Sequence, residues 1–396
     1  QCASRYQRTE LPDTVIHHAK RAVIDWYASL FPGLGCAPLA QLEQVLAEDL
    51  DRGSCRLGNG RMATARAAAL FNGSAAHAAE VDDSFRDAMY HPGAATIAAA
   101  LAASQQAGAG GLDFLRAVVL GYEVSTRIGV TLGRAHYRFW HNTGTVGVFG
   151  AAAAAGYALR LDAGPFAHAL ATAATFSAGL QQAFRMDSMS KPLHAGRASA
   201  DGLQAAQLAA RGFTSRADAI ECPQGLIATH GGTASLGAAV ATPNGGWHLR
   251  HNLFKFHAAC YGTHAAIEAA SHLRLQHALR VDDVCRVTVR ASSACEGVCN
   301  IAEPRTGLEA KFSLRHTVAM ALAGVDTAGL DAFSDEAVYA PEVVALRDRV
   351  QVLLAPQCPD LTLIEVVIET QSGTVLRQRY DSGRPASDLL EQQQRL

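Results

Sequence analysis

Apolar residues recur with a helical period along most of the chain up to Gly246, and short breaks rich in Gly, Pro and Asp separate the apolar stretches. Runs of β-branched residues with a period of two are nearly absent there. The frequent alanines allow helix axes to pack closely. The pattern therefore predicts an all-helical domain over residues 1–250. Its expected helices are Asp13–Gly33, Met62–His77, Ala94–Ala107, Gly111–Leu132, Thr143–Leu159 and Pro165–Gln182.

The pattern changes after the Gly-rich break Asn244–Gly246. The first strand-like runs follow it, at residues 286–292, 361–370 and 374–380, and the last two predict a hairpin across Ser372–Gly373. Helical stretches separate the strands, at Ala258–Leu275, Ser313–Leu322 and Pro341–Leu354. We therefore predict an α+β lid domain over residues 251–383, and we expect the C-terminal tail, residues 384–396, to return to the helical domain.

Composition narrows the classes of partner. The 396 residues are 49% hydrophobic and 18% charged, with a net charge of −2, which is typical of a globular protein and argues against nucleic-acid binding. The most apolar run, Thr143–Leu159, is dominated by Ala and Gly, so we expect a buried helix and no membrane contact. Nine cysteines without a CxxC pair, and an amino terminus without an export-type apolar stretch, predict reduced thiols and a cytoplasmic location.

The first segment that could carry chemistry runs from His77 to Gly93 and holds four carboxylates, two imidazoles and a hydroxyl between two Ala-rich helices. A solvated helix end would account for such polarity. The flanking alanines indicate buried surroundings, however, where unpaired carboxylates are costly and acquire shifted pKa values. We therefore favour a functional segment.

The second segment, Tyr137–Thr145, places His141 next to the start of a helix whose glycines recur every third residue. A helix start favours anions because its backbone N–H groups are unpaired. The spacing is not that of a dinucleotide-binding loop, and close helix packing explains the glycines better. A structural histidine and a catalytic one are equally compatible with this position.

The third segment concentrates cations around Lys191, between Arg185 and Arg197. Pro192 favours an extended backbone at Lys191, which predicts that Lys191 lies outside any helix. Positive neighbours favour the uncharged form of a lysine, so Lys191 is a candidate general base. A solvated surface loop is the alternative for such a cluster.

The fourth segment, Lys255–His264, places His257 and His264 on one face if it is helical. No third metal ligand stands at a standard spacing, so the sequence predicts no metal site. Cys260 is better explained as a small buried side chain than as a nucleophile.

Together these motifs resemble the MmgE/PrpD family. The resemblance rests on motifs in the same order across nearly the whole chain: Asn72–His77, Glu80–Ser84, His91–Pro92, His141–Thr145, Lys191–Gly196 and Glu309–Leu314. It implies a mainly α fold, with a large helical domain, a smaller α+β lid and a homodimeric molecule. The family includes 2-methylcitrate dehydratase, cis-aconitate decarboxylase and iminodisuccinate epimerase, which transfer a proton next to a carboxylate without a metal or an organic cofactor.

The resemblance also implies roles for individual residues. His91, His141 and Lys191 match the family's catalytic His, His and Lys, and Asp82 and Asp83 match its paired aspartates. Glu80 replaces a common aspartate, Ser84 a threonine and His316 a tyrosine, and one residue is inserted before His91. We expect catalytic roles for Lys191, His141, His91, Asp83 and Glu80. We expect substrate contacts from Asp82, Ser84, Tyr137, Arg185, His194, Arg197, His257 and His316.

The expected function is a cofactor-independent lyase, a dehydratase or decarboxylase, that acts on a small di- or tricarboxylate. Cations are needed for it because proton removal next to a carboxylate adds negative charge to an anion. An epimerase with two opposed bases is the alternative within the family. A metal-dependent hydrolase and a non-catalytic helical interaction protein are more distant alternatives. The sequence leaves open whether Lys191 or His141 is the base.

Overall fold

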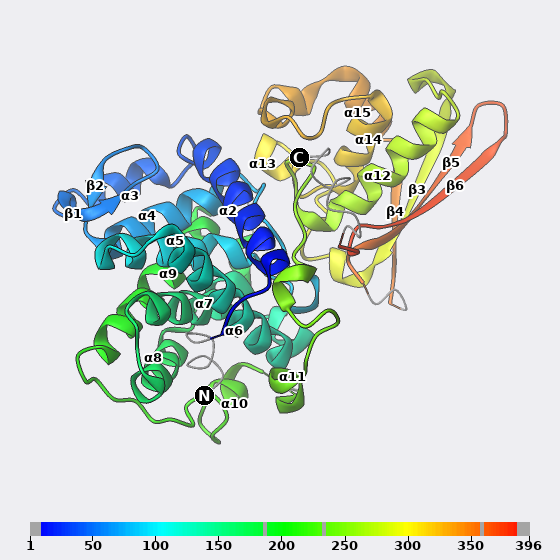
Figure 1. Ribbon diagram of the computed structural model, residues 1–396. Coiled ribbons are helices and arrows are strands. Elements are labelled where there is room, and N and C mark those ends of the chain that lie inside the picture. Colours follow the sequence, from blue (N-terminus) through cyan, green and yellow to red (C-terminus); the bar gives the residue numbers. More distant parts are fainter. Residues whose placement is uncertain (1–8, 185–187, 232–234, 357–359, 386–396) are drawn as a thin grey trace. The chain divides into compact units, whose positions relative to one another are not determined.

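The computed structural model describes residues 9–184, 188–231, 235–356 and 360–385, and the chain divides into two compact units after Phe254. We call residues 1–254 the helical unit and residues 255–396 the α+β unit (Figure 1). Long helices build the first unit, and the second combines helices with a four-stranded sheet. The predicted fold class is therefore confirmed. Most of the tail 384–396, whose return was predicted, lies outside the described residues.

The long helices of the helical unit follow the predicted apolar pattern, with ends that differ by a few residues. They are α2 (Asp13–Gly33), α3 (Leu39–Val45), α4 (Ala65–Ala78), α5 (Pro92–Ala107), α6 (Gly111–Tyr137), α7 (Asn142–Ala158), α8 (Ala163–Phe176) and α9 (Ser190–Ala209), followed by the short α10 (Leu226–His230) and α11 (Leu236–Val240). The helix predicted over Pro165–Gln182 ends early, at Phe176. A single 3₁₀ turn, Gln181–Phe184, follows it.

Helix α7 forms the centre of this unit, and every one of its residues is buried. Its neighbours are α5, α6, α8 and α9. They approach closely because glycines stand at the crossings: a Cβ on Gly150 would lie 2.3 Å from Thr96 Oγ1, and one on Gly202 would lie 2.5 Å from the Val148 carbonyl oxygen. The predicted buried helix is thus confirmed, as is close packing as the reason for its glycines. Among the described residues, no helix combines the length and apolar character needed to cross a bilayer.

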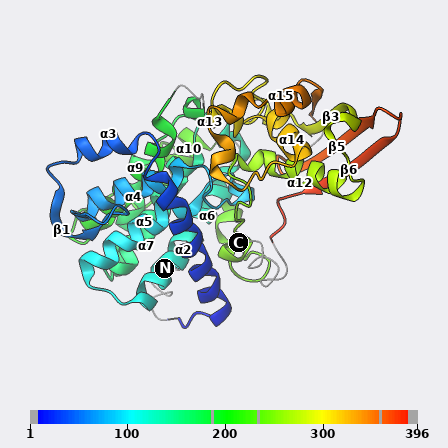
Figure 2. The ribbon, with the colours of Figure 1, turned by 90° about the horizontal axis from the view of Figure 1, so that it is seen from above.

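Helix α2 lies along the bundle against α4, α5 and α6, as the view in Figure 2 shows. Its buried face carries Val15, Ala19, Ala22, Trp26 and Leu30 at helical spacing. Burial of a Val or Leu side chain such as Val15 or Leu30 stabilises the fold by roughly 1.5–3 kcal/mol. The amphipathic pattern, rather than helix propensity, therefore accounts for the position of α2.

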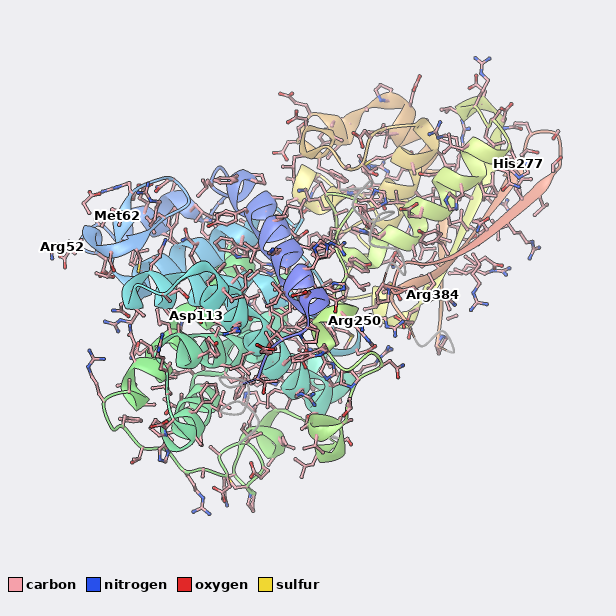
Figure 3. The ribbon with its side chains drawn as sticks, in the orientation of Figure 1. Arg52, Met62, Asp113, Arg250, His277 and Arg384 are labelled. Atoms are coloured by element: carbon pink, nitrogen blue, oxygen red, sulfur yellow. The ribbon has the colours of Figure 1, made fainter. Side chains whose placement is uncertain are left out.

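A hairpin interrupts the part of the chain that was predicted to be all helical. Strand β1 (Leu50–Arg56) pairs with β2 (Met62–Ala63), so the helix predicted from Met62 begins only at Ala65. The Figure 3 labels on Arg52 and Met62 mark this hairpin. The prediction was wrong because β1 contains no β-branched residue, and left-handed backbone at Asp51 and Gly53 interrupts its alternation.

The α+β unit is built on a sheet with the strand order β4-β3-β5-β6. Strands β3 (Val284–Ser292), β5 (Leu363–Thr370) and β6 (Val375–Asp381) are antiparallel neighbours, which confirms the predicted hairpin. Helix α12 (Tyr261–Gln276) packs on β5 and β6, and α14 (Leu314–Ala323) packs on α12.

The helix predicted over Pro341–Leu354 is wrong in its second half. Helix α15 (Pro341–Arg347) ends before Val350–Ala355, which forms β4 and pairs with β3 in parallel. A short apolar run next to a helix has no periodicity that separates strand from helix, and here tertiary pairing decides.

Candidate functional site

Four imidazoles meet inside the helical unit. His77 lies in the last turn of α4, His91 and His141 immediately precede α5 and α7, and His194 lies in the first turns of α9. The ring centroid of His77 is 5.0 Å from that of His91 and 5.3 Å from that of His141, and the centroid of His141 is 5.3 Å from that of His194. We call these four residues the imidazole cluster. Three helix N-termini contribute to it, which favours anions nearby.

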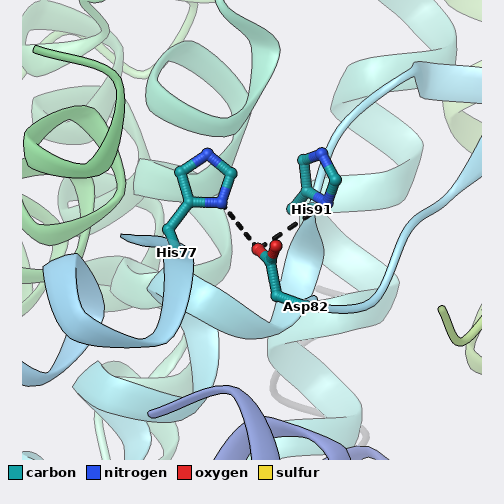
Figure 4. A group of neighbouring side chains, drawn as sticks. All are labelled: His77, Asp82 and His91. Carbon is teal, nitrogen blue, oxygen red and sulfur yellow. Dashed lines mark hydrogen bonds and ion pairs between the residues drawn. The ribbon is translucent and has the colours of Figure 1, made fainter. Parts of the chain in front are cut away.

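Asp82 holds one side of the cluster. Its Oδ2 is 2.6 Å from Nδ1 of His77 and 3.6 Å from Nδ1 of His91, so the carboxylate lies between the two rings (Figure 4). The chain reaches this position because Glu80 adopts a left-handed backbone, with φ of 62°, directly after α4 and turns Asp82 back over the helix end. His77 and Asp82 are both buried.

Asp83 faces away from the rings and fixes the loop. Its carboxylate accepts hydrogen bonds from the Tyr122 hydroxyl at 2.6 Å, from the Asn252 side-chain amide at 2.8 Å and from the Gly93 N–H at 3.0 Å. Burial raises the pKa of Asp83 to about 6, and the neighbouring Asp82 adds to this rise. A carboxylate with three donors is typical of a positioning group, so the geometry gives no support to the predicted catalytic role of Asp83.

The main-chain oxygen of Asp83 orients His91. It lies 2.5 Å from Nδ1 of His91, and a carbonyl oxygen can only accept. Nδ1 therefore carries a proton, and in the neutral ring Nε2 carries the lone pair. At 15% side-chain exposure, His91 is more accessible than His77, at 0%. This geometry suits a proton acceptor or donor that acts through Nε2.

Lys191 and Glu80 form a buried ion pair, and the Lys191 ammonium also lies 5.1 Å from the centroid of the Phe184 ring. The prediction that Lys191 is extended was wrong, because α9 begins at Ser190 and includes it. Pro192 is tolerated there since the first turn of a helix needs no N–H donor from it. Removal of one partner of such a pair typically costs about 3–5 kcal/mol, because the other charge stays buried.

His141 is a neutral imidazole at neutral pH. Burial lowers its pKa well below the usual value, and repulsion from His77, Lys191, His194 and His91 lowers it further. Burial likewise lowers the pKa of His194 to about 4. The two Nδ1 atoms are 3.0 Å apart, so one ring donates to the other. Nε2 of His141 is buried and has no hydrogen-bond partner among the described residues.

The other predicted site residues lie in different places. Tyr137 packs edge-on against Phe184, whose ring also contacts His141. Ser84 is buried and pairs through its backbone with Leu253. Arg197 is largely exposed and pairs with Asp201, so its predicted substrate contact has no support from the geometry, and Arg185 lies outside the described residues.

His257 and His316 belong to the α+β unit. Nδ1 of His257 is 2.8 Å from Thr327 Oγ1. His316 is buried in α14, and burial lowers its pKa to about 4. Their predicted substrate contacts stay predictions.

One group of residues has the composition of a metal site. Ligand atoms of His77, Asp82 and His91 all lie within 4.8 Å of one another. The Nδ1 atom of His91 carries a proton, however, because it donates a hydrogen bond to the Asp83 carbonyl oxygen. A metal ligand needs a nitrogen lone pair instead. Nδ1 of His77 is already bonded to the Asp82 carboxylate. The hydrogen-bonding pattern therefore fits proton transfer better than metal binding.

His77 was not among the predicted site residues, although it lies in the first segment that could carry chemistry. The signal was a histidine at a helix end, followed five positions later by an aspartate. The left-handed backbone at Glu80 brings the two together, and a glutamate gives no hint of such a turn.

Comparisons with known proteins identify the family of this chain. The family model of the MmgE/PrpD N-terminal domain matches residues 1–239, and that of the MmgE/PrpD C-terminal domain matches residues 257–393. A cis-aconitate decarboxylase-like protein of Aspergillus oryzae is 28% identical over 72% of this chain and 63% of its own length. The chain thus spans less than two thirds of that relative.

Two further relatives match more of their own length. Cis-aconitate decarboxylase of Aspergillus terreus is 26% identical over 88% of this chain and 76% of its own length. Human cis-aconitate decarboxylase is 27% identical over 94% of this chain and 80% of its own length.

Proposed function

Because the chain belongs to the MmgE/PrpD family, we propose that it is a lyase that acts on a small di- or tricarboxylate, and specifically a decarboxylase. Decarboxylase ranks before dehydratase because the relatives described above are named as cis-aconitate decarboxylases. The observation that carries the proposal is the buried Lys191 next to a cluster of imidazoles. Such groups can neutralise and protonate a multiply charged anion.

The chemistry of an unsaturated tricarboxylate defines what the site has to do. When the bond to one carboxylate breaks, CO₂ leaves and its electron pair moves through the adjacent double bond. Negative charge then develops next to a second carboxylate, and one proton must be delivered to that carbon. The Lys191 ammonium stabilises this charge, since a preorganised donor of this kind typically contributes about 2.7–4 kcal/mol to the barrier.

Two groups of the imidazole cluster are suited to opposite parts of this proton transfer. His91 can deliver the proton through Nε2 because its Nδ1 is bonded to the Asp83 carbonyl oxygen. His141 is kept neutral by burial and by its positively charged neighbours, so it serves as an acceptor. A positioned acid or base contributes roughly 10²–10⁴-fold to the rate. Glu80 compensates the buried ammonium of Lys191 as its ion-pair partner.

A panel of small polycarboxylates in D₂O tests the proposal, with cis-aconitate as the first compound. We expect CO₂ release and a five-carbon unsaturated diacid that carries one deuterium, followed by NMR. Loss of water from a hydroxy acid would indicate a dehydratase, and deuterium exchange without net conversion an epimerase. Lys191→Met and His141→Gln should abolish turnover. No reaction with any compound of the panel would contradict the proposal.

A further inference from the structure

His77 has the surroundings of a working residue, although neither the motifs nor the chemistry above assign it a part. Its side chain is fully buried, and its Nδ1 is 2.6 Å from the Asp82 carboxylate. Its ring stacks on that of His141, with 18° between the planes, and also lies against His91. Its Nε2 has no hydrogen-bond partner among the described residues. A buried polar atom without a partner is costly, so its presence needs an explanation.

We infer that the Asp82–His77 pair is a positioning element of the site, which holds the His141 ring in place and sets its protonation state. The inference rests on the proposed function, because it assigns His141 a part in that site. Asp82 fixes His77 through Nδ1, and the stacked His77 ring in turn limits the rotation of His141. Repulsion from His77 also disfavours a proton on His141.

The charges that face His141 come from three elements. His77 approaches from α4, Lys191 and His194 from α9, and His91 from the start of α5. After burial, repulsion from His77 is the largest cause that lowers the pKa of His141. The pKa of His194 is also lowered by His77, after the effect of burial. A neutral His141 keeps a lone pair for the substrate proton, which a protonated one lacks.

Geometry separates His77 from the other neighbours. Lys191 is neutralised by Glu80, and His91 is bonded to a carbonyl oxygen. Of the three histidine contacts of the cluster, the His77–His141 contact is the nearly parallel one, since the planes of the other two pairs are inclined by 53° and 45°. His77 is therefore the neighbour that acts on both the orientation and the charge of His141.

The test is an NMR titration of His141 in protein with ¹⁵N-labelled histidine, which needs no turnover. In His77→Gln we expect the pKa of His141 to rise by about one to two pH units, because the repulsion from His77 that lowers it is removed. His77→Phe keeps a ring in the stack and should give a rise in the same direction. Asp82→Asn should abolish the Nδ1–H signal of His77 that the carboxylate bond produces.

His136→Gln is the matched control. His136 is also buried in the helical unit, but it is bonded to Thr145 Oγ1 and the His230 carbonyl oxygen and is absent from the charges that face His141. We expect the His141 titration to stay in place in this variant. An unchanged pKa of His141 in both His77 variants, or an equal rise in His136→Gln, would overturn the inference.

The kinetic arm separates this inference from the proposed function. With a substrate from the panel, kcat/KM is measured as a function of pH. The acid limb of this profile, where kcat/KM falls with decreasing pH, should move to higher pH in His77→Gln by the same amount as the pKa of His141. A merely structural role would lower turnover at every pH without moving the limb, and this result would also overturn the inference. If the wild type converts no polycarboxylate, the proposed function fails, while the titration still decides the part of His77.

Discussion

Each unit of the molecule buries histidines in ring contact, but the two groups differ in what surrounds them. In the α+β unit, the ring centroids of His257 and His264 are 4.9 Å apart, and Tyr261 stacks on His264. Nε2 of His264 is bonded to the Ala259 carbonyl oxygen. Nε2 of His257 is 3.5 Å from the Glu268 carboxylate, and the buried Lys255 adds to the effects of burial and of His257 in lowering the pKa of His264. In the helical unit, the imidazole cluster also adjoins a carboxylate and a buried ammonium, but it joins four rings, and its carboxylate lies 2.6 Å from an imidazole nitrogen. Burial and neighbouring charges are therefore common to both groups, and the number of rings and the shorter carboxylate contact distinguish the candidate site.

The largest expected effect comes from removing the buried ammonium next to the imidazole cluster. Lys191→Met leaves Glu80 buried without its partner, so we expect the free energy of unfolding to fall by about 3–5 kcal/mol. The double variant Lys191→Met/Glu80→Gln should recover much of this loss, while turnover stays abolished. Chemical denaturation measures the first effect. Equal stability of the single and double variants would show that the pair does not need mutual compensation.

Acid should destabilise both units, because each of them buries a histidine whose pKa is lowered. The folded-state pKa is about 4 for His194 in the helical unit and for His316 in the α+β unit, below the usual value of 6.5, and burial is the main cause. Their stabilising contribution is thus complete above pH 6.5 and is lost as the pH falls towards 4. We expect roughly 1–2 kcal/mol per histidine after allowance for solvent screening.

Denaturant midpoints measured between pH 7 and pH 4 check this expectation. His194→Gln and His316→Gln should each flatten the pH dependence by a similar amount. If only the His194 variant flattened the pH dependence, the proton equilibrium of His316 would not contribute to stability, contrary to expectation.

A smaller effect concerns the backbone that brings Glu80 to Lys191. Glu80 has a left-handed φ of 62°, which costs a non-glycine residue about 1–2 kcal/mol. Glu80→Gly and Glu80→Gln both remove the charge, but only glycine adopts the positive φ at this position without strain. We expect Glu80→Gly to be more stable than Glu80→Gln by about 1 kcal/mol in thermal or chemical unfolding. The reverse order would mean that the side chain, rather than the turn, governs this position.

The smallest effect is expected at Arg197, which shares helix α9 with Lys191. Its guanidinium is bonded to Asp201 at 2.7 Å and is 59% exposed. Arg197→Ala should change the free energy of unfolding by only about 0.3–0.5 kcal/mol and leave kcat and KM unchanged. A rise in KM of tenfold or more would show that Arg197 contributes to substrate binding, as the sequence predicted.

The helical domain was predictable because its long amphipathic and Ala-rich helices have a clear period. Strand β1 was not, because Asp51 and Gly53 break its alternation, and β4 was hidden in an apolar run that continues from a helix. Both elements are defined by pairing with a distant strand, which a local pattern does not contain. The expectation that the residue before Pro192 avoids a helix was wrong for Lys191, because a proline is tolerated in the first turn of a helix and not in its interior.

At the candidate site, residue types and order were predictable, but the partners were not. Lys191, His141 and His91 stood out as cations or imidazoles in motifs, and the structure places them together. The pairing of Lys191 with Glu80 joins residues 111 positions apart. Asp82 and Asp83 differ in their hydrogen-bond partners, His77 for the first and Tyr122 for the second. Two adjacent aspartates give no sign of this difference in a sequence.

Because every residue of α7 is buried, its backbone amides have no local route to solvent. They should exchange with deuterium only when the whole helical unit opens, at a rate set by the global stability. His141 immediately precedes this slowly exchanging helix, so the backbone that carries its imidazole should be released only when the whole helical unit opens.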